Sequence, residues 1–157
     1  MTALRFLALD SGLVEAWRRG RADANGQTPE RQLSDGGGNP CRHCLDDIAR
    51  DAPMLVLAHR PFPGPQPYAE VGPIFVHAED CPRYGETAGK PGIFLRREVI
   101  LMRGYGPDDR IVYGTGKVIP TAEIESRAAA LFEDPEIAYI HLRSASNNCF
   151  QCRLERG

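Results

Sequence analysis

The sequence predicts an α+β domain, with a mostly antiparallel sheet, a short N-terminal helix and one main amphipathic helix at 121–133. Segments with strand character outnumber segments with helical periodicity, and two of them are joined by a short turn, as in a hairpin. No regular alternation of strand and helix is present, which argues against a parallel sheet. The 16 glycines and 13 prolines among 157 residues indicate that turns and loops make up much of the backbone.

The chain begins with one strand and one helix. Residues 3–9 are mostly apolar and favour a short strand. Asp10 or Ser11 then caps a helix that runs through Trp17, because these side chains accept hydrogen bonds from the first-turn amides. Only these two elements precede the Gly- and Pro-rich stretch at 20–40, too few to fold alone. We therefore expect a single domain, 1–157, in which 20–40 is a mobile surface loop with one short strand near Arg31–Leu33.

Further strands are expected where apolar and β-branched residues are bounded by turn sequences, at 54–58, 73–77, 98–106, 110–119, 137–142 and 150–154. Pro107–Asp109 predicts a hairpin between the third and fourth of these. The main helix is capped by Thr121 and stopped at Asp134–Pro135. One apolar face of this helix is formed by Ile124, Ala128, Leu131 and Phe132. If this face packs on the sheet, Leu131→Ala should cost about 2–5 kcal/mol.

Charge and hydropathy exclude several functional classes. The net charge of −2 gives no basic field that would gather nucleic acid or anionic lipid, so neither a nucleic-acid partner nor a membrane is expected. Gly114–Lys117 resembles the end of a phosphate-binding loop, but Ile111 replaces the first glycine that this loop requires. No apolar run approaches the roughly 20 residues of a membrane span. Arg5 and Asp10 interrupt the N-terminal apolar run too early for a signal peptide, so we expect a cytoplasmic protein with reduced thiols.

Three segments carry all five cysteines, Cys41-Arg-His-Cys44, His77-Ala-Glu-Asp-Cys81 and Cys149-Phe-Gln-Cys152. The two CxxC pairs indicate a metal site with Cys41, Cys44, Cys149 and Cys152 as ligands, and zinc prefers such a set. The alternatives are that Cys149 and Cys152 are buried small residues of a C-terminal strand, or that Cys41 belongs to a redox pair.

A catalytic interpretation centres on the third segment. Cys81 with His77 could form a nucleophile and its base on a strand-to-loop transition, with Glu79 or Asp80 orienting the imidazole. The competing interpretation is that this neighbouring pair does no chemistry, since no third partner is fixed by the sequence. His59 and His141 lie in expected strands and are interpreted as structural.

The three cysteine segments all lie at edges of expected elements, where functional residues are often presented. In a domain of roughly 15 Å radius of gyration, such edges cannot lie far apart. We therefore expect at least two of the segments to meet around one pocket. The preferred pair is Cys41 and Cys149, with His77 and Cys81 on the rim.

Three blocks of the sequence resemble the bacterial family called domain of unknown function 1203. These blocks are Pro40–Leu45, Gly72–Ala78 with Cys81, and Cys149–Arg153, with Leu131-Phe132 and Tyr139–His141 between them. The resemblance covers most of the chain after Pro40. It implies a small bacterial cytosolic protein and carries over no activity, cofactor or partner.

Two functions of different classes remain open at this point. The first is a small binding module with a Cys/His site that holds zinc. The second is a cysteine-dependent enzyme acting on a small molecule.

Overall fold

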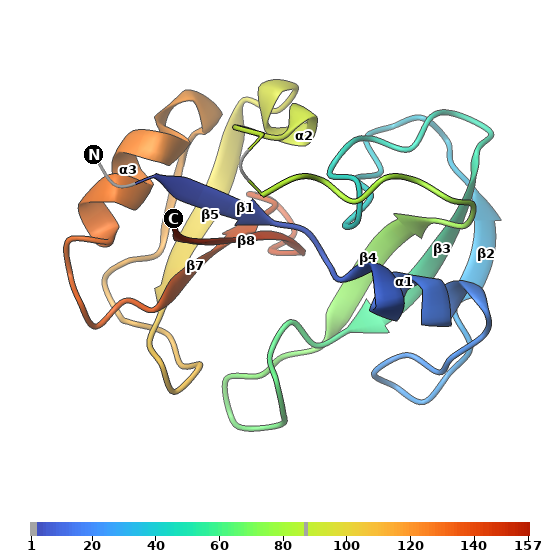
Figure 1. The fold of residues 1–157 in the computed structure, drawn as a ribbon, viewed down its shortest axis with the longest axis horizontal. Coiled ribbons are helices and arrows are strands. Elements are labelled where there is room, and N and C mark those ends of the chain that lie inside the picture. The colour runs from blue at the N-terminus through green and yellow to red at the C-terminus, as the bar shows by residue number, and fades with distance from the viewer. Residues whose placement is uncertain (1–2, 87) are drawn as a thin grey trace.

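The computed structural model describes residues 3–86 and 88–157, and its strands form two antiparallel sheets. The five-stranded sheet has the order β1 (Leu4–Leu7), β8 (Phe150–Arg156), β7 (Tyr139–Arg143), β5 (Val99–Tyr105) and β6 (Lys117–Pro120). The three-stranded sheet has the order β2 (Glu30–Leu33), β3 (Pro53–His59) and β4 (Gly72–His77). Each strand pairs with its neighbours antiparallel. The mostly antiparallel α+β fold is therefore confirmed, but as two sheets rather than one (Figure 1).

The helices are short. They are α1 (Ser11–Arg18), α2 (Gly92–Leu95), the 3₁₀ turn η1 (Thr121–Glu123) and α3 (Ile124–Leu131). Helix α1 begins as predicted, since the Asp10 carboxylate accepts a hydrogen bond from the Leu13 amide at 3.2 Å. The expected helix 121–133 is divided into η1 and α3 and ends earlier, at Leu131. The single turn of α2 was not predicted, because four residues are too few to show a periodicity.

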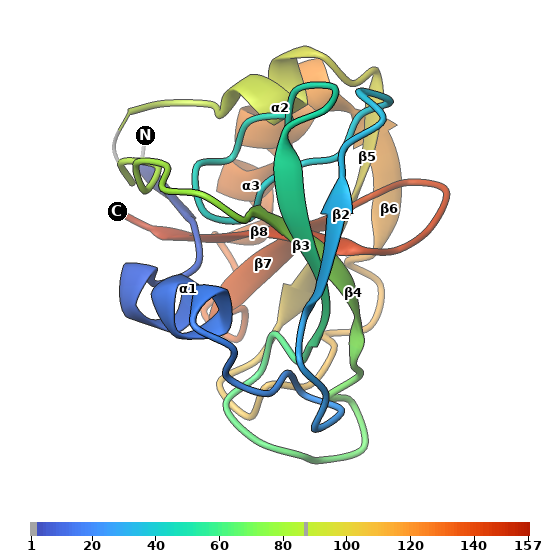
Figure 2. The same ribbon diagram turned by 90° about the vertical axis from the view of Figure 1, so that its right-hand side faces the viewer.

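Two main apolar clusters fill the interior of the described chain. The first joins one face of the five-stranded sheet to α2 and α3, with Phe6, Ile100, Met102, Ile124, Ala128 and Leu142 among its members. Leu131 is only partly buried at the edge of this cluster, so the helix face is centred on Ile124 and Ala128 instead. The second cluster joins α1 to the three-stranded sheet, which Figure 2 shows nearest the viewer. Its members include Val14, Trp17, Cys41, Met54, Ile74 and Val76.

The predicted hairpin after β5 is present but irregular. A tight turn follows Tyr105, in which the Gly106 amide donates to the carbonyl of Arg110 at 2.9 Å. The return strand is limited to β6, because residues 113–116 leave the ladder. The Thr115 hydroxyl accepts from the Gly104 amide at 2.9 Å and so replaces the missing backbone partner.

The segment 20–40 contains β2, close to the strand expected at Arg31–Leu33. The Asp23 carboxylate ties this segment to the end of β3 by accepting from the Ala58 amide at 3.0 Å. Among the residues that the structure describes, no helix has the length and apolar character required to cross a membrane.

Candidate metal centre

The first two cysteines lie in a tight turn that directs both thiols to one side. The Leu45 amide donates to the Cys41 carbonyl, and the Cys41 amide donates to the Asp46 carbonyl, both at 2.9 Å. Leu45 adopts a left-handed φ of 53°, a conformation that glycine usually supplies after the second cysteine of a zinc knuckle. Its side chain is completely buried in the first apolar cluster. Burial of the leucine therefore stabilises the turn despite its backbone strain.

The other two members of the site lie at and after the end of β4. Cys41 forms a parallel bridge with Phe75, and the Arg42 amide donates to the Phe75 carbonyl at 3.0 Å. This pairing places the cysteine turn beside His77, the last residue of β4. Cys81 follows in the loop, and its thiol lies close to that of Cys41.

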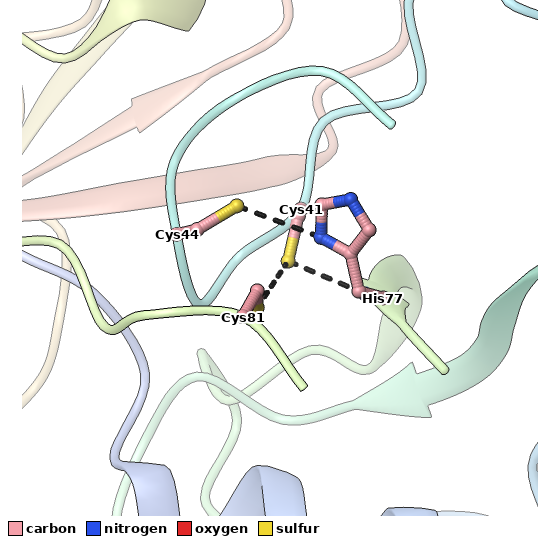
Figure 3. Close-up of side chains that lie close together, drawn as sticks. All are labelled: Cys41, Cys44, His77 and Cys81. Atoms are coloured by element: carbon pink, nitrogen blue, oxygen red, sulfur yellow. Dashed lines mark hydrogen bonds between the residues drawn. The ribbon is translucent and has the colours of Figure 1, made fainter. Parts of the chain in front are cut away.

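Four potential ligand atoms converge at this point, namely the sulfurs of Cys41, Cys44 and Cys81 and a ring nitrogen of His77 (Figure 3). All four lie within 4.8 Å of one another. The Cys41 and Cys81 sulfurs are 3.9 Å apart, and the Cys44 sulfur is 3.5 Å from His77 Nδ1. Ligands of a tetrahedral zinc are separated by about 3.8 Å for two sulfurs and about 3.6 Å for sulfur and nitrogen, given Zn–S near 2.3 Å and Zn–N near 2.0–2.1 Å. The spacing therefore fits a tetrahedral zinc and is far too long for a disulfide.

Several groups around the cluster donate hydrogen bonds to its sulfurs. Arg18 Nη2 donates to the Cys81 sulfur at 3.3 Å, and the His77 amide donates to the Cys41 sulfur at the same distance. His43 Nδ1 lies 3.1 Å from the Cys81 sulfur, and the Ser11 hydroxyl lies 2.8 Å from His43 Nε2. Donors of this kind stabilise thiolates, and they orient and tune the ligands of metal sites.

The protonation of the cluster follows from these contacts. Hydrogen bonds, first from Cys44 and then from Cys81, hold the pKa of the Cys41 thiol well below its usual range. The hydrogen bond with Cys41 raises the pKa of Cys44 in turn. Hydrogen bonds with Cys41 and Cys81 raise the pKa of His77 to about 9. Without a metal, the cluster thus favours a thiolate at Cys41 beside a protonated His77 and a protonated Cys44, so metal binding there would release the protons of His77 and Cys44.

The two C-terminal cysteines lie outside this cluster. The Cys152 thiol is fully buried and lies 3.7 Å from the Leu7 carbonyl, and burial raises its pKa. The Cys149 thiol lies near the Asn147 carbonyl, in the turn before β8. Cys152 lies within β8 and faces the interior, whereas Cys149 precedes the strand, and neither belongs to the group of converging ligand atoms. The group that the structure brings together therefore differs from the set of four cysteines expected from the sequence.

Cys81 has two imidazole neighbours. His77 lies in the same cluster of ligand atoms, with its Nδ1 3.5 Å from the Cys44 sulfur, and His43 Nδ1 lies 3.1 Å from the Cys81 sulfur. Asp80 does not orient an imidazole, since its exposed carboxylate lies 3.5 Å from Arg18. His43 was missed because it lies inside the first CxxC, and Ser11 and Arg18 were missed because no local spacing links them to Cys81.

The family model described as "Protein of unknown function (DUF1203)" matches residues 38–156, which include all four residues of the cluster. The chain belongs to this family, as the resemblance of its cysteine segments implied. Neither the curated proteins nor the solved structures contain a match to the chain.

Proposed function

We propose that this member of the DUF1203 family is a binding module that holds one zinc ion through Cys41, Cys44, His77 and Cys81. The observation that carries the proposal is the convergence of three sulfurs and one imidazole nitrogen within 4.8 Å. Three thiolates and one imidazole are a common ligand set of structural zinc. Carboxylate-rich sites, which suit magnesium or calcium, have a different composition.

The zinc would be structural rather than catalytic. Four protein ligands fill a tetrahedral coordination sphere and leave no position for water or substrate. The ligands come from two segments more than 30 residues apart, and Cys41 is a member of the second apolar cluster. Zinc would therefore fasten the cysteine turn to the end of β4 and so contribute to the free energy of folding.

The test is the zinc content of the purified chain and of single variants, measured by plasma mass spectrometry. We expect one zinc per wild-type chain. Cys44→Ser and Cys81→Ser should each contain less than about 0.2 zinc per chain, because a ligand is lost. Cys149→Ser is the matched control and should keep one zinc. His77→Cys should also keep it, since four thiolates bind zinc well, and this variant controls for loss of fold.

The zinc proposal fails if the wild-type chain takes up no zinc after incubation with the ion. It also fails if Cys44→Ser and Cys81→Ser retain a full equivalent.

A second function is favoured by one specific contact. His43 Nδ1 at 3.1 Å from the Cys81 sulfur, with Ser11 oriented on the other ring nitrogen, is the arrangement of a nucleophile, a base and an orienting group. A pocket of about 480 Å³ adjoins Cys81 and Cys44 and could admit a small molecule. In this alternative, Cys81 is a free nucleophile of a cysteine-dependent enzyme.

Thiol labelling separates the two functions. If Cys81 is a zinc ligand, iodoacetamide should modify it only after chelation, because coordination blocks the sulfur. If it is a nucleophile, it should react faster than Cys149 in the untreated protein, and His43→Gln should slow that reaction.

A further inference from the structure

The five-stranded sheet has a second face, opposite to the face that α2 and α3 cover. Arg103, His141 and Arg153 occupy adjacent positions across β5, β7 and β8. The intervening residues, such as Ile140 and Leu142, belong to the first apolar cluster. Because side chains alternate along a strand, the second face is therefore rich in basic and aromatic side chains.

Part of this face is the floor of a pocket of about 540 Å³. The connection between β1 and α1 and the beginning of the loop after β3 form its walls. Leu7, Phe62 and Phe150 give it an apolar surface, and Arg60 and Arg153 bring two guanidinium groups to it. A third, Arg83, is already engaged by the backbone carbonyls of the β1–α1 connection and by Glu86. The volume falls within the range of small-molecule sites, which combine an apolar lining with a few polar groups.

The charges of this pocket favour an anion. Two carboxylates also line it, but each is already engaged, since Asp10 accepts from the Leu13 amide and Asp109 accepts from the Tyr139 hydroxyl. Arg60 forms no ion pair within the described part of the chain, and its Nε is buried without a partner there. The Arg153 guanidinium stacks on the Tyr139 ring, 3.8 Å from its centroid. Its ion pair with Glu155 is long, with 3.5 Å between the nitrogen and the carboxylate oxygen.

A buried donor on the floor of the pocket points to the same ligand chemistry. His141 is completely buried, and its Nδ1 lies 2.9 Å from Arg143 Nη2. A guanidinium can only donate, so Nδ1 accepts and the ring proton is on Nε2. Burial lowers the pKa of His141 well below its usual value, so the ring is neutral. The Nε2 donor has no partner among residues 3–86 and 88–157, and such a group is costly unless something accepts from it.

We propose that this pocket binds a small organic anion, a carboxylate or phosphate ester with an aromatic or apolar body. The anionic oxygens of the ligand would accept hydrogen bonds from Arg60 and Arg153. One of these oxygens, or another acceptor of the ligand, would accept from His141 Nε2. The apolar body of the ligand would pack against Phe62 and Phe150. This site is separate from the zinc cluster and does not depend on it. The overall charge of −2 favours a small molecule over a nucleic acid.

The test uses phenyl phosphate and benzoate as probes, with benzylamine and benzyl alcohol as cationic and neutral controls. Each compound is titrated into the ¹⁵N-labelled full-length protein, and amide shifts are followed by NMR. We expect saturable shifts at Leu7, Phe62 and Arg153 with one or both anions, and binding at least tenfold weaker for both controls. A preference between the two anions identifies the head group as phosphate or carboxylate.

Variants test the assignment of the arginines. Arg60→Gln and Arg153→Gln should each weaken binding of the preferred anion about tenfold, because a charge-assisted hydrogen bond is lost. Arg31→Gln, at an exposed position of β2, is the matched control and should bind as the wild type does. The dispersion of the NMR spectrum verifies that each variant is folded.

Three results would overturn the proposal. The first is equal binding of the anions and the two controls. The second is unchanged affinity in both pocket variants. The third is binding of a short oligothymidylate more tightly than either anion, which would assign the basic face to single-stranded nucleic acid.

Discussion

At the scale of single residues, the ligands of the candidate metal centre depend on neighbours that hold them in place. Without such neighbours, the side chains of three cysteines and one histidine could adopt many orientations. Here Arg18 and His43 both contact the Cys81 sulfur, and Ser11 contacts the second nitrogen of His43. In this way the first and last residues of α1, Ser11 and Arg18, support a site whose ligands lie elsewhere in the chain.

His43→Gln tests the contribution of this second layer of contacts. We expect zinc to bind about 10–100-fold more weakly, which is the usual effect of removing an outer hydrogen bond to a ligand. The measurement is competition for zinc against a chromophoric chelator, with Cys149→Ser as the control. Unchanged affinity would show that the His43 contact does not stabilise the Cys81 thiolate.

The buried histidines predict how stability depends on pH. Burial, and then the charge of Arg42, lower the pKa of His59 to about 4, and burial lowers the pKa of His141 well below its usual value. In the unfolded chain both rings take up a proton near pH 6.5. Between pH 6.5 and 4 the unfolded state therefore binds more protons, so the free energy of unfolding must fall as the pH falls.

Urea unfolding across this pH range measures the effect. Each imidazole contributes a slope of up to about 1.4 kcal/mol per pH unit. His141→Gln should reduce the slope by roughly one such contribution, and the zinc ligands are the same in both proteins. Equal slopes would mean that His141 is protonated in the folded state.

At the scale of elements, α3 shows how far a periodic pattern specifies packing. Ile124 and Ala128 are fully buried, as the helical repeat predicts, whereas Leu131 lies at the end of α3 and is partly exposed. Ile124→Ala should therefore cost about 2–5 kcal/mol, and Leu131→Ala less. Urea unfolding of both variants measures this order, with the exposed Ala122→Ser as the control. A larger cost at Leu131 would reverse the assignment of the buried face.

Local sequence patterns predict where helices and strands lie better than they predict which strands pair with one another. Runs of apolar and β-branched residues bounded by turn sequences were sufficient to locate β3, β4, β7 and β8, and the Asp10 cap located α1. The division into two sheets depends on which strands pair, and pairing between distant strands leaves no local signal. The same limit applies to the metal site. The spacing of Cys41 and Cys44 indicated half of it, but their contact with His77 and Cys81 depends on the bridge between Cys41 and Phe75.

β8 illustrates why an identical spacing can have two outcomes. Cys41-x-x-Cys44 lies in a turn, and both sulfurs face one point. Cys149-x-x-Cys152 enters a strand, where Cys152 faces the first apolar cluster and Cys149 remains in the preceding turn. The backbone conformation, rather than the number of intervening residues, decides whether a CxxC can bind metal.

At the scale of the whole molecule, the two apolar clusters differ in their relation to the metal centre. The second cluster contains Cys41, and Cys44 and Cys81 pack against it, whereas the first contains none of the four proposed ligands. Zinc is thus expected to stabilise the part of the molecule around the three-stranded sheet more than the five-stranded sheet. Stability need not be uniform across a fold, and regions open separately when their contacts differ.

Hydrogen exchange with and without chelator tests this difference. After removal of zinc by EDTA, amides in 41–45 and β4 should exchange at least about tenfold faster, because the link between the cysteine turn and β4 is lost. Amides in the centres of β5 and β7 should change less, since the helices α2 and α3 still cover that sheet. Cys81→Ser without chelator should reproduce the pattern, which separates loss of the metal from other effects of EDTA. If both sheets lose protection equally, the molecule opens as one cooperative unit, and the zinc stabilises the whole fold rather than one side of it.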